Sequence, residues 1–302
     1  MAFGEIKNTE VSVQSFTRYI GIMPVKVLAV NPNKKELTEI YGREFTEEPN
    51  YLGEVEYEHP VTKQVSKVKT VRVEFIVANE ELDFKGKVSF YLTDTPWIST
   101  SGKCKVIDKY GRTAWVTAEQ FQNKEIPQYA SGPANISSDY APCMRNQEEL
   151  TEFLKYYFGI PEVMRYDNGT WVEVDDTANC EVYLEKIKNY FTGDVSEIKN
   201  AIATASANKI KVLVGIKMTN GNTYQDIYTG KFMRNNAVST KQLEKSVKDT
   251  QTAGGYANTL FNVGEVTVWD GTHPNTAAAT PTVANPFASS DSPATPNTNL
   301  PF

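Results

Sequence analysis

The sequence predicts a mixed β protein with a helical insert, an α+β class in which strands come first, helices follow and a hairpin closes the domain. Three patterns predict this class. Apolar and polar residues alternate between residues 65 and 117, apolar residues recur at helical spacing over about 146–207, and an Asn-Gly turn divides a β-rich run over about 209–232. The chain of 302 residues is long enough to bury a substantial core.

The first strands are predicted from two β-rich runs. Tyr19–Val30 is the earlier run, and Val65–Ala78 is the clearer one because apolar side chains fall on alternate positions along it. These alternating apolar residues are Val71, Val73, Phe75 and Val77. A period of two is typical of a strand with one buried face.

The alternation continues along Val88–Thr93, which predicts a strand that turns Tyr91 toward solvent. Lys103–Ile107 and Thr113–Thr117 then flank a turn at Asp108–Gly111, and this arrangement predicts a hairpin. In that hairpin Trp115 falls on a polar face with the alternate lysines of the partner strand.

Helices are predicted next. Asn146 followed by Glu149 has the form of a capping box in front of an apolar helical stripe. Further helices are predicted over Glu181–Phe191 and from Asp194 onward. A turn at Asn168-Gly169 predicts a small hairpin among them.

The closing hairpin is predicted from Lys209–Met218 and Thr223–Phe232, which are separated by Asn220-Gly221. Three strand regions, a helical section and a closing hairpin follow the element order of an oligonucleotide/oligosaccharide-binding (OB) barrel, whose helix lies between its third and fourth strands. An ordinary α+β domain is the alternative. We expect an OB-centred domain over residues 1–270.

The end of the chain differs in composition. No lysine or arginine follows Lys248, and residues from Gly271 onward are mostly Thr, Asn, Ala, Pro and Ser. Such a segment buries too little apolar surface to offset its ordering entropy, so we expect a disordered tail over residues 271–302. The tail ends in an apolar tip that suits capture by a partner protein, formed by Leu300, Pro301 and Phe302.

Several functional classes are excluded by what the sequence lacks. Three scattered cysteines and two histidines do not fit a disulfide framework or a zinc site. The sequence contains no phosphate-binding loop, dinucleotide fingerprint or nucleophile elbow. Adjacent acids such as Asp175-Asp176 are typical of solvated surface. We therefore expect neither enzymatic activity nor a cofactor. No long apolar run or signal peptide is present, which favours a cytoplasmic protein without membrane contact.

The middle of the chain predicts a binding surface for single-stranded DNA. The whole chain has a net charge of −6, but the residues between Val61 and Trp115 hold ten basic and six acidic side chains. Exposed rings among cations suit a single strand, because cations follow the phosphates and rings stack on bases. The expected phosphate contacts are Lys67, Lys69, Arg72, Lys103, Lys105, Lys109 and Arg112. The expected stacking residues are Tyr91, Trp97, Tyr110 and Trp115, although the two tryptophans could instead be core residues.

The basic, aromatic stretch Lys105–Trp115, the low-complexity tether and the Leu-Pro-Phe terminus resemble the OB-fold single-stranded DNA-binding proteins of bacteria and tailed phages. The resemblance implies single-stranded DNA as ligand, and a tail tip that recruits replication or repair proteins and competes with DNA for the groove. The tail departs from the family because it carries only Asp291 and the terminal carboxylate as negative charges, which makes it a weaker electrostatic competitor of DNA. The barrel region is also longer and more interrupted than in the bacterial members. This difference favours a divergent phage protein in the host cytoplasm.

Two other functions are compatible with the same features. One is a virion or scaffold component whose tail is an assembly peptide. The other is a strand-annealing recombination protein with a similar surface. The sequence does not determine the oligomeric state, and a homo-oligomer is compatible with it.

Overall fold

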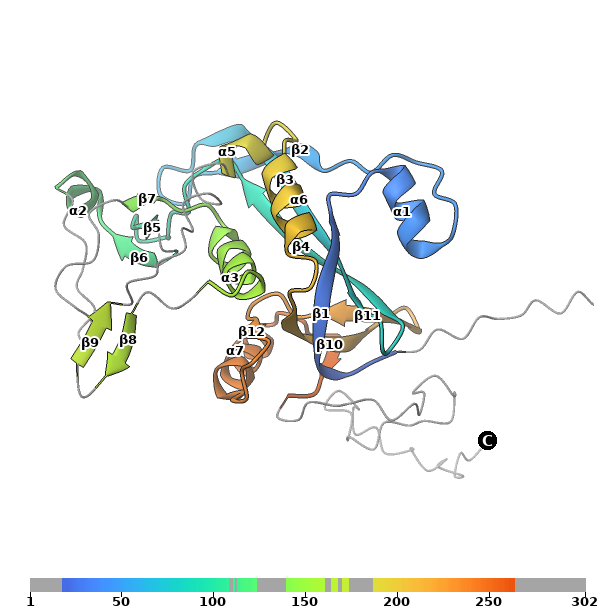
Figure 1. The fold of residues 1–302 in the computed structure, drawn as a ribbon. Coiled ribbons are helices and arrows are strands. Elements are labelled where there is room, and N and C mark those ends of the chain that lie inside the picture. Colours follow the sequence, from blue (N-terminus) through green and yellow to red (C-terminus); the bar gives the residue numbers. More distant parts are fainter. Residues whose placement is uncertain are drawn as a thin grey trace, which may run out of the picture. The chain divides into compact units, whose positions relative to one another are not determined.

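The computed structural model describes residues 18–108, 111, 113–123, 140–160, 164–167, 170–173 and 187–263 (Figure 1). Its helices and strands all lie within one compact unit, Ile20–Val268. Every described strand pairing is antiparallel, and short helices accompany the strands. The predicted mixed α+β class is therefore confirmed. The predicted tail, with Leu300, Pro301 and Phe302, lies outside the described residues.

Five strands form the main part of the largest sheet. They are β1 (Gly21–Val30), β3 (Val65–Asn79), β4 (Phe84–Thr93), β10 (Ile210–Thr219) and β11 (Asn222–Ile227). Hydrogen bonding places them in the order β4-β3-β1-β10-β11. The sequence patterns predicted all five, and β4 starts earlier than its alternation suggested.

Strand β1 joins the two halves of this sheet. Gly21–Val25 pairs with β10, whereas Lys26–Val30 pairs with β3. The register with β3 shifts between Val27 and Ala29, which marks an irregularity of the kind that bends a strand. Strand β1 thus pairs with β10 through its first half and with β3 through its second half. The sheet bends where β1 passes from one partner to the other.

Three short strands extend the large sheet. β2 (Leu52–Glu58) pairs with the first half of β3, and β12 (Met233–Arg234) and β13 (Thr259–Phe261) pair with β10. The β2 segment was not predicted as a strand, because its residues are almost all exposed and it has no buried face.

The hairpin predicted from Lys103–Ile107 and Thr113–Thr117 is confirmed as β5 (Cys104–Asp108) and β6 (Thr113–Val116). Strand β7 (Tyr140–Pro142) pairs with β5 and completes a three-stranded sheet. A separate pair, β8 (Met164–Asp167) and β9 (Thr170–Glu173), confirms the small hairpin between the predicted helices.

The described helices are short. The predicted ones are found as α3 (Gln147–Tyr157), α5 (Ile187–Tyr190) and α6 (Ser196–Thr204), although residues 181–186 lie outside the described part of the chain. Three further described helices were not predicted, and they are α1 (Lys34–Tyr41), α2 (Ala118–Gln122) and α7 (Lys241–Thr252).

The predicted capping box at the start of α3 is wrong. Asn146 adopts a left-handed conformation with φ of 63° and makes no capping hydrogen bond. Its side-chain amide donates instead to the backbone oxygen of Tyr91 at 3.0 Å. Gln147 supplies a local bond, since its Oε1 accepts from the backbone N–H of Met144 at 2.8 Å. A tertiary contact to β4 has thus replaced the local cap.

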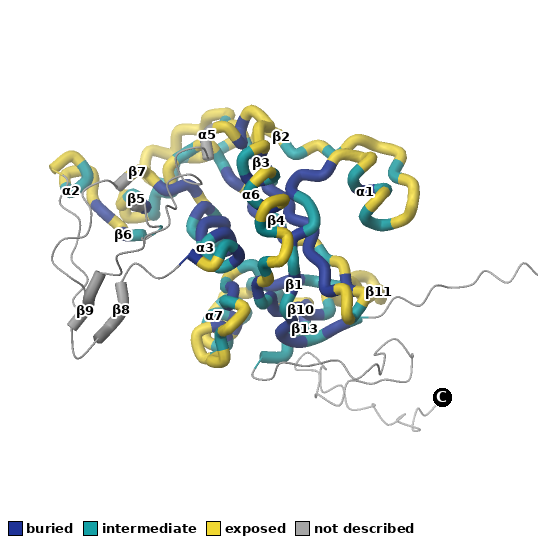
Figure 2. The backbone as a smooth tube through the Cα atoms, viewed as in Figure 1, coloured by how far each residue is buried: buried dark blue, intermediate teal, exposed yellow. Residues whose placement is uncertain are grey.

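The core is centred on an aromatic cluster between α3 and the sheet. Phe153 of α3 has ring-centroid distances of 4.7 Å to Phe75, 5.7 Å to Phe90 and 5.0 Å to Phe232. All four rings are buried, and the tube in Figure 2 is dark blue along α3 and the neighbouring strands. The apolar stripe predicted for α3 therefore packs onto β3 and β4, which fixes the helix against the sheet.

The strands do not close into a barrel in the described part of the chain. β4 and β11 lie next to each other at the two ends of the strand order, but no ladder of hydrogen bonds joins them. Gly86 permits this close approach, since a Cβ atom there would lie 2.8 Å from Cδ1 of Ile227. The mixed α+β class is thus shown, while closure into the predicted OB-type barrel is not, because the sheet stays open between these two strands.

None of the described helices is both long enough and apolar enough to cross a membrane.

Candidate nucleic-acid interface

The outward face of β4 carries Tyr91, the most exposed of the three predicted stacking residues that the structure describes. Tyr91 is 58% exposed, while its neighbours Phe90 and Leu92 are buried. Tyr91 lies opposite Arg72 in the β3–β4 register, and Ser89 lies opposite Glu74. Directly opposed residues of antiparallel strands share a face. The predicted alternation is thus confirmed, and it places Tyr91 and Arg72 side by side.

The cations of this face surround a buried carboxylate. Glu74 is only 3% exposed, and it pairs with Lys87 Nζ at 3.1 Å and Arg72 Nε at 3.6 Å. The Arg72 guanidinium also lies 5.2 Å from the centre of the Tyr51 ring. These contacts orient Arg72 and Lys87 while their side chains stay partly exposed. The Glu74 charge offsets part of their positive charge.

The same carboxylate affects two tyrosines behind the face. Burial, and then the negative charge of Glu74, raises the pKa of Tyr41 to about 12 and raises the pKa of Tyr51 as well. Both phenols therefore stay neutral under ordinary conditions. The Tyr51 hydroxyl donates to the backbone oxygen of Pro32 at 2.8 Å, which holds this ring beneath Arg72.

A second aromatic group lies at the β5–β6 hairpin. The rings of Trp97 and Trp115 meet edge to face with centroids 5.5 Å apart. Trp115 is 36% exposed and Trp97 is half-buried, so neither is a core residue. Arg145, which the sequence analysis did not select, places its guanidinium 5.8 Å from the Trp97 ring. Because 48 residues separate Trp97 from Arg145, only the fold reveals this contact.

Lys105 contacts both tryptophan rings. Its ammonium lies 4.4 Å from the centre of the Trp97 ring and 5.8 Å from that of Trp115. It also forms an ion pair with Glu148, and its side chain is only 11% exposed. The predicted shared face of Lys105 and Trp115 is confirmed by their register. Its paired and buried ammonium, however, suits positioning of the rings better than direct contact with phosphate.

One short segment links the two aromatic groups. The backbone N–H of Trp97 donates to the oxygen of Cys143 at 2.8 Å, and the N–H of Cys143 donates to the oxygen of Lys105 at 2.9 Å. Asn146, three residues further on, holds the backbone of Tyr91. We call the set Tyr91, Trp97, Trp115 and Arg145 the aromatic track. Its members are fixed to one backbone network.

Lys67 and Lys69 do not belong to this surface. They occupy odd positions of β3, so they project to the opposite face from Arg72. Directly across from them on β2 lie Glu56 and Glu54. Cross-strand pairs of opposite charge stabilise a sheet. We call β2 and the paired residues Val65–Val71 of β3 the β2–β3 arm, and because its lysines lie across from glutamates, its net charge is close to neutral.

The sequence window of the basic surface was too narrow to show this neutralisation. It began at Val61, and extending it back to Leu52 adds three glutamates and no lysine or arginine. The local excess of positive charge falls from four to one. The acidic strand β2 was missed because it precedes the basic run in sequence and pairs with it only in the fold.

Lys103 is exposed and directly precedes β5. Lys109, Tyr110 and Arg112, which were predicted to contact DNA, lie outside the described residues.

Another exposed ring was missed on the β10–β11 hairpin. Tyr224 is 50% exposed and lies directly opposite Lys217. Asn220 and Gly221 form the turn with φ of 51° and 76°, which confirms the predicted Asn-Gly hairpin. In the sequence this segment was considered only as a closing hairpin, and its residues show no alternation that would have marked Tyr224.

A cavity of about 530 Å³ lies beside Tyr91, where the sheet stays open. The outward residues Lys87 and Ser89 of β4 line one side of it, and Asp226 and Ile227 of β11 line another. Asn146 and Glu149, at the start of α3, also line it. A space of this size at a sheet opening is typical of small-ligand sites.

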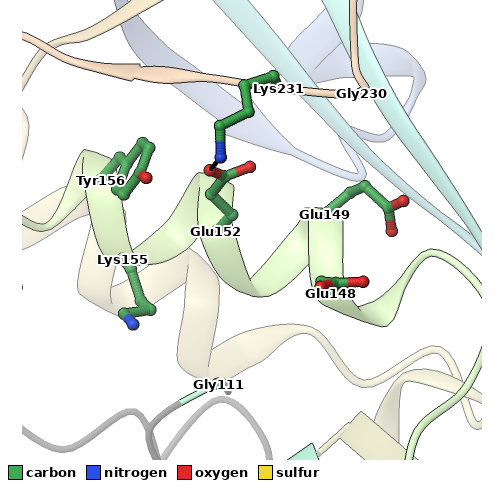
Figure 3. A pocket seen from close by; sticks show the side chains of 8 residues that line it. All are labelled: Gly111, Glu148, Glu149, Glu152, Lys155, Tyr156, Gly230 and Lys231. Carbon is green, nitrogen blue, oxygen red and sulfur yellow. Dashed lines mark hydrogen bonds and ion pairs between the residues drawn. The ribbon is translucent and has the colours of Figure 1, made fainter. Parts of the chain in front are cut away.

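A second cavity, of about 350 Å³, adjoins the exposed side of α3 and shares Glu149 with the first. Figure 3 shows its glutamates along the helix and the ion pair between Lys231 and Glu152. Burial raises the pKa of Glu149, and its Oε2 atom is buried without a hydrogen-bond partner.

The described residues contain no cluster of three or more histidine, cysteine, aspartate or glutamate side chains that could hold a metal ion. Comparisons of the chain with family models, curated proteins and solved structures found no match.

Proposed function

We propose that this protein binds single-stranded DNA, with little dependence on sequence, along the aromatic track and the outward face of β3 and β4. The observation that carries the proposal is the connection of exposed Tyr91 to the Trp97–Trp115 pair, with Arg145 and Arg72 beside the rings. Rings at several points along one backbone network suit successive bases, and the cations beside them suit the phosphates.

We further propose that the sheet is an open variant of the OB fold. Alternating antiparallel pairings make β4 and β11 run in the same direction at the ends of the order β4-β3-β1-β10-β11. An OB barrel has this five-strand order and is partly open, and its helix precedes the fourth strand as α3 precedes β10. In that fold the second and third strands bind the ligand, which supports the β3–β4 face as the site.

The proposed mechanism divides the work between rings and cations. Stacking on Tyr91 and Trp115 contributes about 1–3 kcal/mol per base, whichever base is bound. Four described cations are partly or fully exposed near the rings and would neutralise phosphates, namely Arg72, Lys87, Lys103 and Arg145. Lys105 holds the tryptophan pair in place. Lys217 and Tyr224 provide a further contact if the strand extends to the β10–β11 hairpin.

The C-terminal tip is proposed to recruit replication or repair proteins. Leu300, Pro301 and Phe302 end a segment without basic residues, so the tip would stay free of bound DNA. Affinity capture of a replication protein should be lost when these three residues are deleted, and unchanged capture would contradict this role.

Titration of the intrinsic tryptophan fluorescence with oligo-thymidine at low salt tests the main proposal. We expect quenching, because bases stack on Trp97 and Trp115, and weaker binding to duplex DNA of the same length. A protein that binds neither DNA would be a structural component instead. Mixing complementary strands with the protein separates a strand-annealing protein, which speeds pairing, from one that holds strands apart.

A further inference from the structure

The β2–β3 arm has an outer edge that the proposed DNA surface does not use. Strand β2 lies at one end of the strand order, and its neighbour among the described strands is β3. Every residue of β2 except Tyr57 is exposed. An edge strand presents a row of backbone N–H and C=O groups that can pair with another strand. The outer edge of β2 is therefore a place where an extended segment can add to the sheet.

Hydrogen bonds to β3 show which backbone groups of β2 point outward. At the two ends of the strand, the oxygen of Tyr51 accepts from the N–H of Arg72 at 2.8 Å, and the N–H of His59 donates to the oxygen of Gln64 at 2.9 Å. Every second residue of an antiparallel strand bonds to the same neighbour, so the odd-numbered residues of β2 bond to β3. The backbone groups that point away from β3 are those of the alternate residues Glu54, Glu56 and Glu58.

The side chains along this edge define the chemistry of a partner strand. Glu54, Glu56 and Glu58 share one face of the arm, and Val55 and Tyr57 share the other. Val55 is 45% exposed although it is apolar. Because directly opposed residues of neighbouring strands share a face, an added strand needs cations opposite the glutamates and apolar side chains opposite Val55 and Tyr57.

Two simpler occupants do not fit this edge. A symmetric antiparallel pair of two β2 strands opposes residues of the same face, so it sets a glutamate against another glutamate wherever the two strands overlap along these residues. The rest of the chain lacks the required pattern as well. No segment outside the described residues contains two basic residues at alternate positions, and residues 264–302 contain no basic residue. The charge pattern therefore favours a different protein as the partner.

We propose that the outer edge of β2 binds an extended segment of a partner protein in which basic and apolar residues alternate. The segment bonds to the outward backbone groups of β2, and its cations lie opposite Glu54 and Glu56. It thereby continues the alternation of charge that these glutamates form with the lysines of β3. The edge contains no residue of the aromatic track, so this inference does not rest on DNA binding.

Fluorescence anisotropy of a labelled peptide with the core Lys-Val-Lys-Val-Lys, titrated with the full-length protein, tests the assignment. A peptide with the core Lys-Lys-Lys-Val-Val has the same charge without the alternation, and we expect it to bind about tenfold more weakly. The double variant Glu54→Gln/Glu56→Gln should bind the alternating peptide about fivefold more weakly than the wild type, because two opposed charge pairs are lost. The matched control is Glu44→Gln/Glu47→Gln, which removes the same charge from exposed positions outside β2 and should bind as the wild type does.

Amide hydrogen exchange, followed for each residue by NMR, locates the bound peptide. The N–H groups of Glu54 and Glu56 should become protected on binding, whereas those of Val55 and Tyr57, which already bond to β3, should change little. Equal affinity for the two peptides, or unchanged affinity in Glu54→Gln/Glu56→Gln, would overturn the proposal and indicate general attraction to an acidic protein. Binding without protection of the β2 amides would overturn it as well. Thermal melts verify that both double variants are folded.

Discussion

At the scale of single residues, exposure distinguishes rings that bind from rings that fold. Phe90 and Tyr91 are neighbours on β4, yet Phe90 is 2% exposed and Tyr91 is 58% exposed. Phe90 packs against Phe153 in the core, and Tyr91 has its ring in solvent next to Arg72. Their opposite environments follow from the two-residue period of the strand. The exposed ring is therefore available to a ligand at little cost in stability.

Tyr91→Ala should weaken binding to oligo-thymidine about tenfold, because one stacking platform is lost. Tyr91→Phe keeps the ring and should bind nearly as the wild type does. Fluorescence anisotropy with the three proteins measures both effects. If the alanine variant bound as tightly as the wild type while remaining folded, Tyr91 would not lie on the path of the strand.

Glu149 links a single residue to the pH dependence of stability. Burial raises the pKa of this carboxyl in the folded protein, so the native state favours the protonated form. Its stabilising contribution is complete below the pKa of the unfolded chain and is lost as the pH rises through the folded pKa.

Relative to the wild type, Glu149→Gln should therefore gain free energy of unfolding as the pH rises, because the amide does not ionise in its buried position. The two proteins should become similar in acid, where the wild-type group is protonated. Urea unfolding at several pH values measures this difference. A variant that is less stable at neutral pH would show that the carboxylate has a stabilising partner in the fold.

At the scale of elements, strands with a regular alternation could be predicted from the sequence, and their partners could not. Val88 to Leu92 follow the burial that their alternation indicates, whereas Glu74 and Ile76 of β3 are buried on the face that the pattern of Val71 to Val77 left to solvent. Strand β2 has exposed residues on both faces, so hydrophobic patterning carries no signal for it. Helix α7 has only two buried residues, Leu243 and Val247, in twelve positions. Capping boxes at Asn33 and Thr117 did mark α1 and α2, and these signals were overlooked.

The candidate site was also predicted only in part, because the sequence shows local alternation but not which distant segments contact each other. Tyr91 and the shared face of Lys105 and Trp115 follow from local alternation. The approach of Arg145 to Trp97 and the neutralisation of Lys67 and Lys69 by β2 depend on contacts between segments that are distant in sequence or were not expected to pair.

The lysines that β3 turns toward β2 and the arginine beside Trp97 lead to opposite expectations for DNA binding. Replacing both Lys67 and Lys69 by alanine should change DNA affinity less than twofold at moderate salt, because each lies across from a glutamate on the far side of the strand. Arg145→Ala, with one charge removed beside Trp97, should have the larger effect. The DNA affinities of the double variant and of Arg145→Ala, measured in the same buffer, test this expectation. A larger loss of affinity in the double variant would place the DNA on the β2–β3 arm.

At the scale of the whole molecule, a protein with a net charge of −6 is proposed to bind a polyanion. Its cations must therefore act locally, and salt must weaken binding according to the number of phosphates that they neutralise. The four exposed cations near the rings predict a slope of log affinity against log salt of about −3 for a single strand. A series of titrations from low to moderate salt gives this slope. A value near zero would indicate that no ionic contacts hold the strand.

The central claim is that a single DNA strand runs along the aromatic track. Photocrosslinking of full-length protein to bromouracil-substituted oligonucleotide, followed by mass spectrometry of the crosslinked peptides, tests it most directly. We predict crosslinks at Tyr91 and at Trp97 or Trp115, and their loss from the Tyr91 peptide in Tyr91→Ala. Crosslinks confined to the β2–β3 arm, or to peptides outside β4 and the β5–β6 hairpin, would contradict the account.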